Sequence, residues 1–241
     1  LSSLNSNRNI ANIVKMEESF SFMDEFGDVH KVVIEEYCEK GDLSRVLKKK
    51  SLKNIVILSY MVQILNGVDV MHSAGWIHRD LKPQNIFVTR KNVIKLGDFG
   101  FTIHEADKSS VHGGTRDYMS PSQFDQFTAG VTNVEASLAD DMWSVGTILV
   151  EMITRRHNDM KIMIRNNSNY IISNIKQHCN FAPELTELLE QLLQYDAQKR
   201  ITASEAVKSM RALVQKFAAT LIQKLYKGYA ARKRWKSRIS K

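Results

Sequence analysis

The chain has very little cysteine and no long hydrophobic run. Its two cysteines, Cys38 and Cys179, lie far apart and in no spacing that suits a metal site. This excludes a disulfide-stapled scaffold or a cysteine-based zinc module and favours a reduced, cytoplasmic protein. No apolar run reaches about 18 residues, so a transmembrane segment is not expected. Residues 1–9 lack the basic start and apolar core of a secretory signal, and the absence of an initiator methionine indicates a fragment.

Acidic residues are missing from the C-terminal segment. Residues 207–241 contain eleven lysines or arginines and no aspartate or glutamate. The formal net charge of the chain is +8, so subtracting these eleven charges leaves −3 for residues 1–206. The basic character therefore belongs to the C-terminal segment, and the mildly acidic remainder argues against nucleic-acid binding. The composition, 43% hydrophobic and 25% charged, is that of an ordinary globular protein.

Periodic patterns predict the elements of the first half of the chain. β-branched and aromatic residues on both sides of the turn residues 24–28 predict two strands within residues 13–36. Asp42 is a suitable N-cap for a following helix. Apolar residues at every third or fourth position from Leu52 to His72 predict a long amphipathic helix that ends near Gly75.

The second half is predicted to be mainly helical after an irregular stretch. Residues 101–136 are rich in small polar residues with weak periodicity and are expected to be mostly loop. Helices are expected over residues 138–153 and 185–193. Thr202-Ala-Ser-Glu205 forms a capping box. The helix that it opens is expected to run to about Lys236, because no proline intervenes and the segment holds a single glycine.

The most informative stretch lies at residues 77–100. It begins Ile-His-Arg-Asp-Leu-Lys-Pro-Gln-Asn and ends Lys-Leu-Gly-Asp-Phe-Gly. Asp80, Lys82, Asn85 and Asp98 thus fall within nineteen positions. Two acids, a lysine and an amide are what phosphoryl transfer requires: a base for a hydroxyl, a cation for phosphate charge, and oxygen ligands for Mg²⁺.

This order, H-R-D-L-x-x-x-N followed by D-F-G, resembles the catalytic-loop and metal-loop signature of protein kinases. Three later segments, residues 114–121, 141–146 and 196–206, are similar to further kinase motifs, so the resemblance covers roughly residues 10–213. Residues 36–42, 85–89 and 95–98 look most like the NIMA-related (NEK) kinases. The resemblance implies an α+β, protein-kinase-like fold: a mostly helical large lobe, a remnant of the small β lobe, and a C-terminal helix.

The resemblance also implies a role for each site residue. Asp80 would accept or orient the proton of the substrate hydroxyl, and Thr115 would bond to Asp80 and Lys82. Lys82 would sit near the transferred phosphate, and a lysine here resembles the Ser/Thr-specific class. Asn85 and Asp98 would hold Mg²⁺. The residues implied to contact ATP are Glu36, Cys38, Phe87, Lys82, Asn85 and Asp98.

The chain departs from the kinase pattern at its start. No G-x-G-x-x-G and no V-A-I-K-type lysine precede the catalytic loop. Residues 9–14 resemble the turn after the helix that carries the lysine's glutamate partner. Residues 1–38 are therefore expected to be a remnant of the small lobe with the hinge, and residues 39–213 the large lobe. Two explanations stay open: a truncated reading of the gene, or a natural kinase remnant that acts by binding.

Three further positions bear on activity. Ser122 stands where the family has the glutamate of A-P-E, which normally pairs with the arginine matched by Arg200, so Ser122→Glu is expected to raise stability. Glu35 aligns with the gatekeeper, a slot that is usually apolar or threonine, unless the register is shifted by one. Ser109 and Ser110 are candidates for phosphorylation with Arg79 as the phosphate ligand, or ordinary solvated loop serines.

The C-terminal segment, residues 214–241, carries a second motif. Residues 222–235 fit the pattern I-Q-x-x-x-[RK]-G-x-x-x-[RK] with an aromatic residue after it, which resembles the IQ motifs gripped by calmodulin and related EF-hand light chains. Its apolar strip on a basic helix suits an acidic, methionine-lined groove. The alternatives are a solvated basic helix or one that lies on an anionic membrane.

The expected function is a Ser/Thr protein kinase that transfers the γ-phosphate of Mg-ATP to protein hydroxyls and is linked to calmodulin. The alternative is a catalytically impaired pseudokinase or scaffold that binds calmodulin. The intact Asp80, Lys82, Asn85 and Asp98 favour the enzyme, whereas the missing phosphate clamp favours the scaffold. A cytoplasmic location is expected, with cytoskeletal association as a further option.

Overall fold

The computed structural model describes residues 11–49, 51–107, 113–131, 135–154, 168–178 and 183–239. In the last helix, side chains are described as far as Tyr229. Cys179 and the phosphorylation candidates Ser109 and Ser110 lie outside the described residues, as do the side chains of the IQ-like motif beyond Tyr229.

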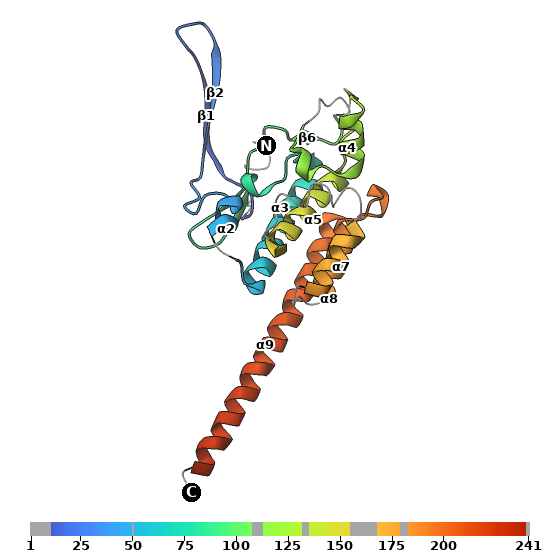
Figure 1. The fold of residues 1–241 in the computed structure, drawn as a ribbon. Coiled ribbons are helices and arrows are strands. Elements are labelled where there is room, and N and C mark those ends of the chain that lie inside the picture. Colours follow the sequence, from blue (N-terminus) through green and yellow to red (C-terminus); the bar gives the residue numbers. More distant parts are fainter. Residues whose placement is uncertain are drawn as a thin grey trace.

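The first described elements form a free-standing hairpin. β1 (Met16–Met23) pairs antiparallel with β2 (Val29–Glu35). The turn between them is held by Asp24, whose carboxylate accepts the N–H groups of Phe26 and Asp28, each at 2.9 Å. The prediction of two strands around this turn is confirmed. Figure 1 shows the hairpin projecting from the body of the molecule.

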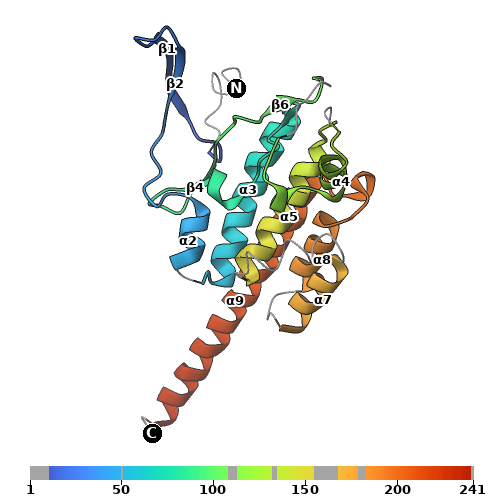
Figure 2. The ribbon, with the colours of Figure 1, turned by 45° about the horizontal axis from the view of Figure 1, so that its top comes forward.

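The body is built around one buried helix. α3 (Asn54–Ser73) packs against α5 (Leu138–Thr154) and against the first part of α9 (Ala203–Ile239), as Figure 2 shows. α3 is long and apolar enough to span a membrane by length and composition. Its apolar character is accounted for by its place in the core, where Met61, Ile64 and Leu65 are fully buried. The predicted helix over residues 52–72 is confirmed.

Short strands tie the site loops to this body. β4 (Ile86–Val88) pairs antiparallel with β5 (Ile94–Leu96), and β3 (Trp76–Ile77) pairs with β6 (Ile103–His104). A single turn, η1 (Pro83–Asn85), leads into β4, and α2 (Leu43–Lys49) packs beside it. Asp42 caps α2 as expected, because its carboxylate accepts the N–H of Arg45 at 2.9 Å.

The structure contains helices that the sequence patterns did not predict. Residues 101–136 were expected to be mostly loop, but they include the short turn η2 (Arg116–Tyr118) and α4 (Pro121–Thr128). α4 begins with a capping box between Ser120 and Gln123 and has proline in its first turn. α7 (Ser168–His178) was not predicted either. Both helices are short and mostly polar, so neither contains a long apolar pattern in the sequence.

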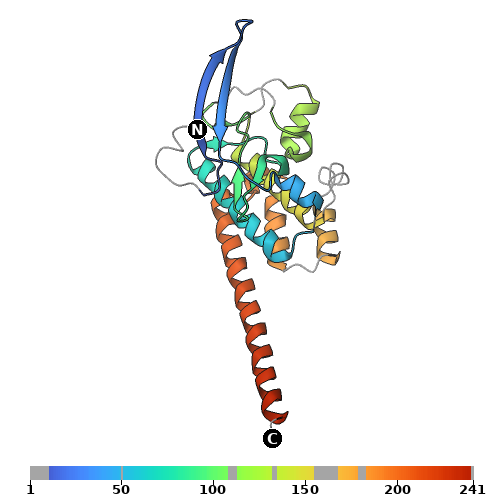
Figure 3. The same ribbon diagram turned by 90° about the vertical axis from the view of Figure 1, so that its left-hand side faces the viewer.

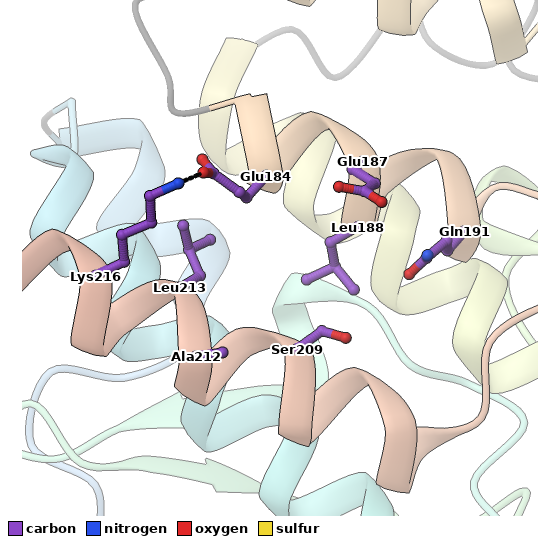
Figure 4. Close-up of a pocket in the computed structure, with 8 residues that line it drawn as sticks. All are labelled: Glu184, Glu187, Leu188, Gln191, Ser209, Ala212, Leu213 and Lys216. Atoms are coloured by element: carbon purple, nitrogen blue, oxygen red, sulfur yellow. Dashed lines mark hydrogen bonds and ion pairs between the residues drawn. The ribbon is translucent and has the colours of Figure 1, made fainter.

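The C-terminal helices pack against each other, and one of them, α9, also packs against α3. α8 (Pro183–Leu192) lies against α9, and the predicted helix near this position is confirmed. Figure 4 shows their facing sides, which border a groove of about 240 Å³ with Lys216 ion-paired to Glu184. After the turn η3 (Ala197–Lys199), the capping box of Thr202 and Glu205 opens α9.

α9 is a single helix of 37 residues with two different environments. Its first turns are buried through Ala206, Met210 and Leu213, and Phe217 is half-buried against the same core. The following turns project away from the body, at the end opposite the hairpin (Figure 3). The expected boundary at residue 213 therefore falls within a continuous helix, and the predicted length of this helix is confirmed.

Candidate active site

The loop that carries Asp80 is braced from below by a buried carboxylate. Asp141 accepts the backbone N–H of His78 at 2.8 Å and that of Arg79 at 3.0 Å, and His72 Nε2 lies 2.9 Å from it. Burial acts to raise the pKa of Asp141, but the hydrogen bonds from His72 and the loop hold this pKa below its usual value. The ionised carboxylate thereby stabilises Arg79 in a left-handed conformation, with φ of 69°.

His78 links this loop to the segment that holds Asp98. Burial lowers the pKa of the His78 ring, which favours the neutral form. The ring nitrogen Nε2 donates to the carbonyl of Gly97 at 3.1 Å, and the ring lies 5.4 Å from that of Phe99. His78 and Phe99 thus pack between the two loops and help to set their positions.

Four of the predicted catalytic residues form one hydrogen-bonded cluster. The Thr115 hydroxyl donates to Asp80 Oδ1 at 2.8 Å, and Lys82 Nζ donates to Asp80 Oδ2 at 2.7 Å and to Thr115 Oγ1 at 2.9 Å. The amide group of Asn85 donates to the same Oδ2 at 2.9 Å. Asp80 is 3% exposed, so this carboxylate is held in one orientation by three partners.

Gly114 allows Thr115 to reach this cluster. Its φ is +101°, and a Cβ atom at this position would lie 2.4 Å from the carbonyl oxygen of Arg79. Any side chain would therefore push the segment of Thr115 away from the catalytic loop. The Gly-Thr pair in the sequence is thus explained by the close approach of two backbones.

The β4–β5 pairing brings the two predicted metal ligands to the same place. Ile86 is opposite Leu96 in the ladder, and the N–H of Gly97 donates to the carbonyl of Asn85 at 3.0 Å. Asn85 comes just before β4 and Asp98 just after β5, so the two residues lie at the same end of this pair of strands. The Asn85 NH₂ group donates to Asp80, so its side-chain oxygen is the atom that it could offer to a cation. The carboxylate of Asp98 is exposed.

These donors fit Mg²⁺ that is shared with a phosphate. One amide oxygen and one carboxylate are hard ligands of the kind that Mg²⁺ prefers, and they leave most of its six positions to water and phosphate oxygens. No group of three or more His, Cys, Asp or Glu side chains gathers as a metal site within the described residues. The donor set thus suits Mg²⁺ bound together with a nucleotide and does not suit a metal held by protein alone.

Two of the predicted ATP-contacting residues lie near this strand end in the chain's path. Cys38 is buried, and Phe87 in β4 forms an isolated antiparallel bridge with Asp42, four residues after Cys38. A Cβ atom on Gly97 would lie 2.8 Å from the Phe87 ring and 2.9 Å from Val14, so only glycine fits there. Glu36 accepts the N–H of Lys15 at 2.8 Å through its carboxylate.

Glu35, the expected gatekeeper, is the last residue of β2 and is exposed. The surrounding chain still shields its carboxyl group in part, which raises the pKa of Glu35, and the negative charge of Asp98 raises this pKa further. The assignment of Glu35 to the gatekeeper slot stays a prediction.

Arg200 has other partners, although Ser122 stands where the family has a glutamate. Its guanidinium donates to the carbonyl of Ala139 and, at 3.0 Å, to that of Gln194, and it stacks 5.2 Å over the Trp143 ring. The negative charge that it faces belongs to buried Asp140. Ser122 is exposed, with its hydroxyl 3.0 Å from that of Ser120. Backbone carbonyls and the Trp143 ring thus provide partners for Arg200 in place of the expected glutamate.

One charged pair of this region was not predicted from the sequence. Lys95 Nζ lies 2.6 Å from Glu36 Oε1, although the two residues are far apart in the chain. The available signal was the register of β4 and β5, which sets Lys95 opposite Phe87 and next to the hinge. That register is not visible in a single sequence, because both strands are only three residues long.

A carboxylate clamped between a lysine, a threonine and an amide, beside oxygen ligands for Mg²⁺, is the arrangement of a phosphoryl-transfer enzyme. The family description "Protein kinase domain" matches residues 2–210, and the chain belongs to the protein kinase family.

Similar proteins support this assignment. The chain is 30% identical over 209 residues to the serine/threonine-protein kinase Nek9 of Xenopus laevis, covering 81% of the chain and 21% of that protein. It is 36% identical over 152 residues to Nek4 of Mus musculus, covering 61% and 18%. It is 32% identical over 217 residues to a putative mitogen-activated protein kinase 14C of Drosophila melanogaster, covering 77% and 58%. The chain thus spans about a fifth of the two Nek proteins.

Proposed function

We propose that the protein is a serine/threonine kinase that transfers the γ-phosphate of Mg-ATP to a Ser or Thr hydroxyl of a protein. The observation that carries this proposal is the cluster of Asp80, Lys82, Asn85 and Thr115, in which all three partners donate to the Asp80 carboxylate. The likeness to Nek9 and Nek4 supports a NEK-like kinase within this class.

Each residue of the cluster has a task in this reaction. The Asp80 Oδ1 atom accepts one hydrogen bond from Thr115, so it retains a lone pair for the substrate hydroxyl. Asp80 takes the proton of the substrate hydroxyl as the hydroxyl oxygen bonds to the γ-phosphorus of ATP. The bond between this phosphorus and the oxygen of the ADP leaving group breaks. Lys82 lies 2.7 Å from Asp80 and adds positive charge near the moving phosphoryl group. Bound Mg²⁺, held by Asn85 and Asp98, would neutralise the phosphate charge.

The test is phosphate transfer to a generic Ser/Thr protein substrate by the whole chain. Asp80→Asn removes the base but keeps the hydrogen-bonding shape, and we expect it to lower the rate by about 10²–10⁴-fold. Asp125→Asn on the exposed side of α4 is the matched control and should leave the rate unchanged. Equal rates for Asp80→Asn and the wild type would overturn the proposal.

The rival function is that of a pseudokinase or scaffold. It is favoured by the absence of a G-x-G-x-x-G motif from the chain and by the carboxyl group of Glu35 near Asp98. A titration with Mg-ATP separates the two functions, because a scaffold of this kind has no need of the nucleotide. Saturable binding that is lost in Asp98→Ala favours the kinase, whereas no binding by the wild type favours the scaffold.

We also propose that the exposed part of α9 binds calmodulin or a related EF-hand light chain. Five large apolar side chains on this part are 47–71% exposed: Leu221, Ile222, Leu225, Tyr226 and Tyr229. Lysines 216, 224 and 227 follow the other side of the helix, and no acid lies beyond residue 206. An apolar strip on a basic helix complements an acidic groove lined by methionines. The cytoplasmic location that we propose would give access to such a partner.

A pull-down of the whole chain with calmodulin, with and without Ca²⁺, tests this site. Ile222→Asp puts a charge into the apolar strip and should abolish recovery. Thr220→Asp introduces the same charge on the polar side and should reduce recovery far less. Recovery of the wild type and Ile222→Asp in equal amounts would contradict the proposal, and binding to anionic vesicles alone would favour a membrane role for α9.

A further inference from the structure

Glu36 joins three separate segments at the base of the hairpin. Its Oε1 atom lies 2.6 Å from Lys95 Nζ and accepts the N–H of Lys15 at 2.8 Å. Its own N–H donates to the carbonyl of Lys15 at 2.9 Å. The side chains of Lys95 and Glu36 are 13% and 25% exposed, so solvent screens this ion pair less than it screens a surface pair.

Lys95 belongs to the strand that these bonds anchor. The neighbouring Leu96 donates to the carbonyl of Asn12 at 2.9 Å and accepts the N–H of Val14 at 2.8 Å. The segments at both ends of the hairpin therefore contact β5. Glu36 contacts Lys95, and the segment that leads to Lys15 bonds to Leu96, which is two residues before Asp98. The hairpin itself stands clear of the body (Figures 1 and 3), so its base is where its position is set.

The charges around the hinge make Lys95 important there. Glu35, Glu36 and Glu39 surround this stretch of chain with negative charge, and each raises the pKa of the buried Cys38 thiol, which burial itself raises most. Lys95 acts in the opposite direction on the same thiol. A nucleotide carries several negative charges. The position of this one lysine relative to the acids therefore affects the electrostatic energy of a nucleotide bound at the hinge.

We propose that Lys95 is a positioning residue: through its ion pair with Glu36 it holds hinge residues 36–38 beside β5 so that a nucleotide can bind between them and Asp98. The nucleotide part of this proposal rests on the proposed kinase function. The pair differs from the catalytic cluster because it touches neither the transferred phosphate nor Asp80. Without it, Glu36 keeps its bonds to Lys15, and the hinge residues lose their direct side-chain link to β5.

The first measurement follows the exposure of the hinge and needs no nucleotide. In a Cys179→Ser background, Cys38 is the single thiol of the chain, and its buried side chain reacts with a thiol reagent only when the hinge opens. We expect Lys95→Met to speed this reaction roughly tenfold, the effect of losing a hydrogen bond to a charged group. The lost positive charge by itself would raise the pKa of Cys38 and slow the reaction, so faster labelling reports opening.

The second measurement is the affinity for Mg-ATP. Lys95→Met should weaken binding roughly tenfold, and a kinase assay should show a raised KM for ATP with little change in kcat. Lys95→Arg retains the charge and should stay close to the wild type in both measurements. Lys176→Met breaks an exposed ion pair with Glu190 on the helices α7 and α8, and it is the control that should change neither.

Each outcome decides the matter. Faster labelling together with weaker nucleotide binding in Lys95→Met supports the proposal. Unchanged labelling, or faster labelling with unchanged affinity, overturns it. If the wild type binds no nucleotide, the proposed kinase function fails, and labelling alone then decides whether Lys95 holds the hinge.

Discussion

The catalytic loop and the β1–β2 hairpin lie in the same chain but depend on different interactions. His78 and Asp80 of the loop, and Asp141 of α5 that holds the loop, are each 3% exposed or less, and their polar groups are bonded to neighbours from other segments. In the hairpin, Phe22 and Val29 are 49% and 68% exposed, and the strands bond mainly to each other. A site can thus be rigid where its charges are buried, while the adjoining strands contribute little to that rigidity.

The largest loss of stability is expected when the carboxylate that holds the catalytic loop is removed. Asp141→Ala leaves His72 and two loop N–H groups without their acceptor, and it should lower the free energy of unfolding by about 3–5 kcal/mol. Urea denaturation followed by circular dichroism measures this. Asp24→Ala removes a similar set of bonds in the exposed hairpin turn and should cost far less. Equal losses in the two variants would show that burial does not separate the regions.

The pH dependence of stability distinguishes two neighbouring buried carboxylates, those of Asp141 and Asp140. The folded-state pKa of Asp141 is lowered, so its contribution is present above the usual value of 3.8 and is lost as pH falls through the folded pKa. Burial raises the pKa of the adjacent Asp140, so its effect has the opposite sign: folding is favoured at low pH and loses that advantage as pH rises past 3.8.

Thermal unfolding between about pH 3 and 6 tests these opposite signs. Asp141→Asn should flatten the loss of stability on acidification, whereas Asp140→Asn should make it steeper. Variants that shift the profile in the same direction would refute the assignment.

A smaller effect is expected at Ser122. Ser122→Glu would bring a carboxylate toward Arg200, but this arginine already donates to backbone carbonyls and faces Asp140. We therefore expect a gain in stability within about 1 kcal/mol, the range of an exposed ion pair. Differential scanning calorimetry can measure this. A gain of several kcal/mol would mean that Arg200 lacks an adequate partner in the wild type.

The smallest effect is expected in the hairpin. Phe20→Ser replaces a side chain that is 46% exposed, so the free energy of unfolding should change by no more than about 0.5 kcal/mol. Leu65→Ala in α3 is the buried counterpart and should cost about 2–5 kcal/mol. A large loss for Phe20→Ser would show that the hairpin face is packed in solution.

Local patterns predicted what local interactions decide. The hairpin follows from alternation around a turn, α3 from apolar periodicity, and the start of α9 from the capping box of Thr202 and Glu205. The cluster at Asp80 could be anticipated because its motifs resemble those of a family. The pair of Lys95 with Glu36 and the bond of Arg200 to the Ala139 carbonyl could not, because each depends on contacts between residues distant in the chain.

The continuity of α9 makes it a spacer as well as a surface. The helix runs without interruption from the capping box at Thr202 to Ile239, and among its side chains described as far as Tyr229, those of the first turns alone are packed against the body. Each residue inserted between Phe217 and Leu221 would move every later side chain outward by about 1.5 Å and turn it by roughly 100° around the axis. The distance and the direction in which the kinase body would present the proposed partner are therefore set by the number of residues in this one helix.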